Sequence, residues 1–129
     1  MAETIGGRRT SDRMTRPLGP DLVSEEGLRE LVRLGHQVVV ICLEPAKRRG
    51  SVWYGLWGIR CVSLDGSSDR ILVAYRRDKE HGGDRPRTFR TLSGLVGFLY
   101  DLGFRTLSIP FSAGERVAHT PDPHGEPPP

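Results

Sequence analysis

The chain has 129 residues, 36% of them hydrophobic and 27% charged, with a net charge of +3, and this length suits one domain. Its longest uninterrupted apolar run covers only residues 38–43, which is far too short to cross a membrane, and two cysteines cannot make a disulfide framework. We therefore expect a cytoplasmic protein that neither spans a membrane nor binds to one.

Both ends of the chain are poor in large apolar side chains. The first 21 residues contain four arginines, and the last 18 end in the stretch TPDPHGEPPP, whose prolines oppose helix formation. Neither segment can bury enough apolar surface to offset the entropy lost on ordering it. The sequence therefore predicts a disordered basic tail over 1–21, a folded domain over 22–111 and a Pro-rich disordered tail over 112–129.

The first element of the domain has the pattern of a short helix. Ser24 is placed to cap a helix over 25–34, two glutamates follow in the first turn, and Gly35 is suited to end it. The next stretch, QVVVICLE over 37–44, is a continuous β-branched run typical of a buried strand. Pro45 is expected to end that strand, because it has no backbone N–H to donate.

Three further strands are predicted in the middle of the chain. Residues 52–64 read as a long strand that two glycines interrupt, which indicates a bulge or strong coiling. The pair Asp65-Gly66 predicts a hairpin turn into an alternating strand over 70–77. After a polar loop over 78–86, residues 87–90 form a short fourth strand.

A second helix is predicted over 92–102, with Thr91 or Ser93 as its cap. Its leucines, valine and phenylalanine recur at the i, i+3, i+4, i+7 spacing of one buried face. Gly103 is expected to end it, and residues 104–111 then read as a last strand.

These elements follow the order α-β-β-β-β-α-β. The fold class that they predict is α+β, with one small domain in which about five mainly antiparallel strands carry two short helices on one face. The four strands and following helix over 37–102 resemble, in their order, the small coactivator and Whirly-type folds that bind single-stranded DNA. The leading helix and the trailing strand depart from that arrangement.

The histidines and glycines do not form a recognisable catalytic motif. None of the four histidines stands at metal-ligand spacing with another His or Cys within the predicted domain. The stretch HGGD over 81–84 is the most enzyme-like, but charged residues surround it as they do in many solvated loops. No phosphate-binding loop or nucleophile elbow occurs. We expect a protein that is not an enzyme and has no metal or cofactor, and a small nuclease or toxin is the least favoured alternative.

Positive charge is concentrated in the centre of the chain. Residues 36–112 carry twelve basic side chains against seven acidic ones, and only two of the 19 basic residues in the whole chain are lysines. Arginine suits bidentate contacts to phosphates and bases, and it stacks on aromatic rings. The charge distribution favours an anionic partner, although a GC-rich genome would enrich arginine equally well.

The stretch AKRRGSVWYGLWGIR, residues 46–60, places three cations in a turn before an aromatic strand. Strand alternation puts Trp53 and Trp57 on one face with Ile59 and Cys61, and it leaves Tyr54 and Arg60 on the other. The tryptophans are more simply core than surface, but the pattern leaves both interpretations open. An outer sheet face with an aromatic ring and several arginines is a common way to bind single-stranded nucleic acid. The candidate nucleic-acid-binding residues are Lys47, Arg48, Arg49, Tyr54, Arg60, Arg76, Arg77, Arg87 and Arg90.

The leading functional hypothesis is a small, non-enzymatic, nucleic-acid-binding regulatory protein that uses an arginine and aromatic sheet surface, with single-stranded DNA or RNA as its partner. The alternative is a protein-interaction module, such as an adaptor or an inhibitor of a larger enzyme, because tryptophan, tyrosine and arginine are also enriched at protein interfaces. In either case the chain could act as a homodimer.

Overall fold

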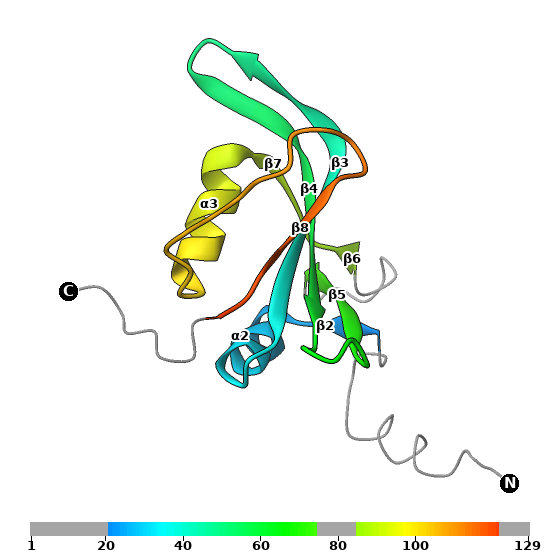
Figure 1. The fold of residues 1–129 in the computed structure, drawn as a ribbon. Coiled ribbons are helices and arrows are strands. Elements are labelled where there is room, and N and C mark those ends of the chain that lie inside the picture. The colour runs from blue at the N-terminus through cyan, green and yellow to red at the C-terminus, as the bar shows by residue number, and fades with distance from the viewer. Residues whose placement is uncertain (1–20, 75–84, 122–129) are drawn as a thin grey trace, which may run out of the picture.

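A curled, mainly antiparallel sheet carries two helices on one face, as Figure 1 shows for a computed structural model that describes residues 21–74 and 85–121. The predicted α+β class is confirmed. In chain order the elements are β2 (Leu22–Val23), α2 (Glu25–Arg33), β3 (Gln37–Arg49), β4 (Val52–Val62), β5 (Asp69–Ala74), β6 (Arg85–Pro86), β7 (Thr88–Thr91), α3 (Leu92–Asp101) and β8 (Arg116–His119).

The sheet is built around the long hairpin of β3 and β4. Its strand order is β2-β5-β4-β3-β8, with β6 added to β5 and β7 added to β4. The described strand pairs are antiparallel, with one exception: β2, the first described strand, runs parallel to β5. The strand β4 pairs with β5 near its end and with β7 nearer its start, so β4 is flanked on both sides along most of its length.

The core lies between the helices and one face of the hairpin. Three cross-strand pairs, Val38 with Cys61, Val40 with Ile59 and Cys42 with Trp57, place six fully or nearly fully buried side chains on this face. Trp57 is therefore a core residue, as its alternation with Ile59 and Cys61 indicates. The helices contribute Leu28, Val32, Leu95, Phe98 and Leu99 to the same cluster.

Both helices begin at side-chain caps that the sequence suggests. The Ser24 hydroxyl accepts the N–H of Gly27 at 3.1 Å, and the Thr91 hydroxyl accepts the N–H of Gly94 at 3.1 Å. These bonds satisfy backbone donors that the first turn of a helix leaves without a partner. Of the two caps considered for α3, Thr91 is the one observed.

The strand β3 does not end at Pro45, and this corrects the prediction. It continues to Arg49, and the cations expected in a turn form its last residues. Register shifts between Cys42 and Glu44 and between Glu44 and Lys47 leave Pro45 outside the register with β4. Bulges are positions where a strand tolerates proline, because no ladder hydrogen bond is required there.

The last strand and the end of the domain also differ from the prediction. No strand forms over 104–111; instead Phe104, Leu107 and Ile109 pack against the core from an irregular segment. The strand β8 lies in the region predicted to be a Pro-rich tail over 112–129, and it pairs with β3. The domain boundary predicted at residue 111 therefore falls too early, because the ordered chain includes β8.

The imidazole of His119 shows how β8 is held. It is buried, its Nε2 accepts the N–H of Ser108 at 3.1 Å, and its Nδ1 lies 3.3 Å from the carbonyl oxygen of Val38. One side chain thus joins β8 to β3 and to the irregular segment that precedes it. The remaining predictions for the tails, over 1–20 and 122–129, lie outside the described residues.

Candidate nucleic-acid interface

The outer half of the β3–β4 hairpin, residues 46–55, projects beyond the rest of the described domain, and we call it the arm (Figure 1). Lys47 pairs with Tyr54, Arg48 with Trp53 and Arg49 with Val52. The chain reverses at Gly50, whose φ of 62° is favourable for glycine and costly for most other residues. The arm is therefore a two-stranded ribbon with a tight turn at its tip.

The base of the arm is held by the segment that leads into β8. The N–H of Ala46 donates to the carbonyl oxygen of Phe111 at 2.9 Å, and the Phe111 ring lies 4.9 Å from that of Trp53 between centroids. The indole N–H of Trp57 donates to the carbonyl oxygen of Pro110 at 2.8 Å. These contacts fix the direction in which the arm leaves the sheet.

A glycine at the base lets the two tryptophans share one face. A Cβ added at Gly55 would lie 2.8 Å from the Trp57 ring, closer than such contacts occur in proteins. The ring of Trp57 therefore fills the space that any side chain at position 55 would need. Sequence reasoning interpreted this glycine only as a break in the strand.

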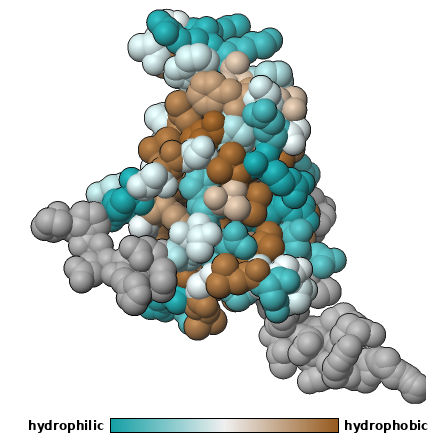
Figure 2. Space-filling view, in the orientation of Figure 1, coloured by the Kyte–Doolittle hydropathy of each residue, from teal (hydrophilic) through white to brown (hydrophobic). Residues whose placement is uncertain are grey.

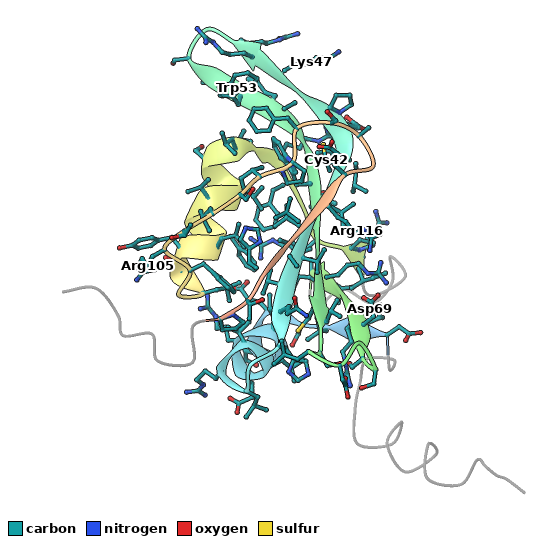
Figure 3. The ribbon with its side chains drawn as sticks, in the orientation of Figure 1. Cys42, Lys47, Trp53, Asp69, Arg105 and Arg116 are labelled. Carbon is teal, nitrogen blue, oxygen red and sulfur yellow. The ribbon has the colours of Figure 1, made fainter. Side chains whose placement is uncertain are left out.

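The three cations of the arm occupy both of its faces. Trp53 and Trp57 both lie near Phe111 on the helix side of the sheet, so Arg48, which pairs with Trp53, shares that side. The side chains of Lys47 and Arg49, paired with Tyr54 and Val52, lie on the opposite, outer face. Figure 3 shows Lys47 and Trp53 on the arm, and Figure 2 shows strongly hydrophilic residues gathered at the top of the molecule, where the arm ends.

No carboxylate neutralises these cations within the described residues. All three side chains are exposed, and among residues 21–74 and 85–121 none of them forms an ion pair within 4.0 Å. The Nε–H of Arg48 donates to the carbonyl oxygen of Gly50 at 2.8 Å, which orients the guanidinium at the turn. Residues 45–64 contain four basic side chains and no Asp or Glu, so the tip carries an uncompensated positive charge.

Arg90 lies near the base of the arm and has a weak partner. Its Nη1 is 3.8 Å from a carboxylate oxygen of Glu44, and both side chains are largely exposed. An exposed pair at this distance contributes little to stability. Arg90 therefore adds a cation next to the arm, and this cation is only weakly paired with Glu44, the acidic residue of β3.

The structure does not bring all the predicted arginines to one surface. Arg60 faces the outer side, six residues along β4 from Tyr54, and its Nε donates to Asp69 at 2.7 Å. Arg87 lies on the helix side, where it donates to Glu25 at 2.9 Å and stacks over Phe89 at 4.9 Å. Both side chains are engaged within the domain.

Two other predicted residues, Arg76 and Arg77, lie outside the described residues, as does the stretch HGGD. The candidate interface in the described chain is accordingly the arm with Arg90. The single arginine-covered sheet face that the sequence suggested is divided between the two sides of the sheet.

Phe111 is the functional neighbour that sequence reasoning missed. It supports the arm from a position 58 residues after Trp53, whereas the sequence pattern predicts it only as the last residue of a strand. A local pattern cannot reveal this contact, because it depends on how the segment between α3 and β8 crosses the helix side of the sheet.

Both cysteine thiols of the described chain are held in their protonated form by burial. Burial raises the pKa of the Cys61 thiol to about 11 and also raises the pKa of Cys42, so neither thiol supplies much thiolate at neutral pH. Hydrogen bonds from Arg29 and Arg87 hold the pKa of Glu25 below its usual value. Among residues 21–74 and 85–121, no group of three or more His, Cys, Asp or Glu side chains is placed to hold a metal ion.

Neither described helix has the length and apolar character that crossing a membrane requires. No protein family model matches the chain, and no curated protein or solved structure matches it. The geometry and charge of the arm are the features that bear on function.

Proposed function

We propose that this protein is a non-enzymatic, nucleic-acid-binding regulatory protein that contacts its partner through the arm. One observation carries the proposal: three adjacent cations lie exposed at the tip of a projecting ribbon, without an ion-pair partner among the described residues. A projecting element can approach a phosphate backbone without a clash from the rest of the domain. Cations that lack an ion-pair partner within their own chain are suited to a binding partner that carries the opposite charge.

The energetics of this contact come mainly from phosphate neutralisation. Each Lys or Arg that contacts a phosphate releases condensed counterions, so affinity falls steeply as salt rises. Lys47, Arg48 and Arg49 can together account for up to about three contacts in that salt dependence. Arg90 stands close enough to the base of the arm to add a further contact once its distant partner Glu44 is screened.

The direct test replaces Lys47, Arg48 and Arg49 together by alanine. The variant is expected to bind oligonucleotides more weakly at low salt, and the slope of log affinity against log salt should fall by up to about three. Fluorescence anisotropy with a labelled oligonucleotide over a salt series measures both quantities. No binding by the wild-type chain at low salt would reject the proposal.

A matched control removes the same charge elsewhere. Replacing Arg29, Arg33 and Arg105 by alanine takes three exposed cations from α2 and from the segment that follows α3, and it leaves the arm intact. This control is expected to retain most of the affinity and the salt slope. An equal loss in both triple variants would mean that net charge, and not the arm, governs binding.

A second candidate function is a protein-interaction module. Apolar side chains are exposed around the arm, namely Leu43, Val52, Tyr54 and Phe111, each between 37% and 47% exposed. Aromatic and apolar groups of this kind serve as anchors at protein interfaces. A partner held by such anchors would bind with little salt dependence, so the same titration separates the two functions.

A further inference from the structure

We infer that the arm recognises duplex DNA of the B form by entering its major groove. This inference rests on the proposed nucleic-acid binding and specifies its target. It differs from the expectation of a single-stranded partner, which assumed an open sheet face with stacked bases.

The shape of the arm fits a groove. Paired strands lie about 4.8 Å apart, and a ribbon of two strands fits the major groove of B-DNA, which is about 12 Å wide and 8.5 Å deep. Residues 46–50 make up one side of the arm, and at about 3.3 Å for each residue they reach roughly 15 Å from the sheet. The tip can thus reach the floor of the groove before the body of the domain meets the phosphates.

The charges of the arm fit the two walls of that groove. Lys47 and Arg49 lie on its outer face, and Arg48 lies on its helix side. A ribbon inside the groove has one phosphate backbone on each side, so the cations on each of its faces can contact phosphates at the same time. A single strand bound across one face would leave the cation on the opposite face without a contact.

The aromatic side chains of the arm argue against a stacking platform. The Trp53 ring is half-buried and packs against Phe111 at a tilt of 46° with centroids 4.9 Å apart, so part of its surface is already occupied by a neighbour within the domain. Among the described residues of the arm, Tyr54 is the one aromatic ring that is exposed. Binding of single strands without a duplex depends on several such platforms in a row.

Arg48 stands close to the turn on the helix side, so its guanidinium can contact either the phosphate wall on that side or a base edge on the groove floor. Its Nε–H is already bonded to the carbonyl oxygen of Gly50, which fixes the guanidinium at the turn while its terminal amino groups carry no described bond. Arginine in the major groove donates two hydrogen bonds to guanine O6 and N7. Double-stranded RNA is a poorer target, because its major groove is deep and too narrow for side chains to read.

The test compares three probes of equal length with the full chain at the same low salt: a mixed-sequence DNA duplex, its single strand, and the RNA duplex of the same sequence. The DNA duplex is expected to bind at least ten times more tightly than either of the others. Methyl green, which occupies the major groove, should compete for the duplex, whereas netropsin, which occupies the minor groove, should not. The triple alanine variant of Lys47, Arg48 and Arg49 should lose the preference for the duplex.

Each alternative outcome overturns the inference. Equal or tighter binding of single-stranded DNA or duplex RNA would leave the proposed function standing but reject the major groove of DNA as the target. Competition by netropsin alone would move the contact to the minor groove. Absence of binding to all three probes would reject the proposed function and the inference together.

Discussion

The two halves of the β3–β4 hairpin belong to one antiparallel strand pair, interrupted by register shifts on either side of Glu44, and they have opposite environments. In the inner half, Trp57 is completely buried in the core cluster and pairs with Phe89 of β7. In the outer half, Trp53 has the same parity but is only half-buried, supported by Phe111. The difference shows that the neighbours of a strand, more than its own pattern, decide how deeply a side chain is buried.

The same comparison separates stability from binding. The inner half holds the apolar pairs of the core, and the arm holds cations that contribute nothing to that core. A substitution can therefore be expected to affect one property without the other.

Replacing Trp57 by alanine is expected to lower the free energy of unfolding by about 3–5 kcal/mol. The substitution removes a fully buried ring and the hydrogen bond from its indole N–H to Pro110. Replacing Trp53 by alanine should cost less than half as much, because that ring is partly in solvent. Urea denaturation followed by circular dichroism measures the free energy of unfolding of both variants. Equal losses would contradict the difference in burial between the two halves.

Replacing Gly55 by alanine tests the boundary between the halves. The new Cβ would lie 2.8 Å from the Trp57 ring, so the ring or the strand must shift, at an expected cost of about 1–3 kcal/mol. Gly97 in α3 is the matched control, because an added Cβ there has no neighbour within 4 Å. Alanine at position 97 should stabilise the protein by about 0.5–1 kcal/mol. Stabilisation at both positions would mean that the Trp57 ring is not packed as described.

The turn at the other end of β4 should respond to acid. Hydrogen bonds from the backbone N–H and hydroxyl of Ser67, and from the hydroxyl of Ser63, lower the pKa of Asp65 to about 2. A carboxyl with a lowered pKa stabilises the fold above its ordinary pKa, and that contribution is lost as the pH falls from about 4 towards 2. The variant Asp65→Asn should show less loss of stability over this interval. Thermal melts at several pH values would show it, and parallel curves for both proteins would contradict the expectation.

The smallest expected effect on stability belongs to the arm. Alanine in place of Lys47, Arg48 and Arg49 should change the free energy of unfolding by less than about 0.5 kcal/mol, since all three side chains are exposed. Thermal and urea unfolding of the triple variant measure this directly. A loss comparable to that of Trp57→Ala would show that the cations belong to the fold, and the separation of the two halves would fail.

Several features of the fold follow from local patterns, which is why the sequence predicts them. The caps Ser24 and Thr91 act on their own first turns, and the alternation of Trp57, Ile59 and Cys61 needs only a straight strand. The strand β8 had no such signal, because its four residues are short and partly polar. Its pairing with β3 depends on the buried His119 and on a partner about 80 residues away in the chain.

For the candidate site, the sequence by itself determined which residues are cationic and that the stretch over 45–64 contains no acidic side chain. Tertiary structure decided where those charges lie. The bulges around Pro45 let β3 continue to Arg49, which turned an expected loop into a projecting arm. Arg60 forms an ion pair with Asp69, and Arg87 forms one with Glu25, so both guanidinium groups already have partners within the domain. Charge is a property of each residue, whereas its availability depends on which distant groups the folded chain brings within hydrogen-bonding distance.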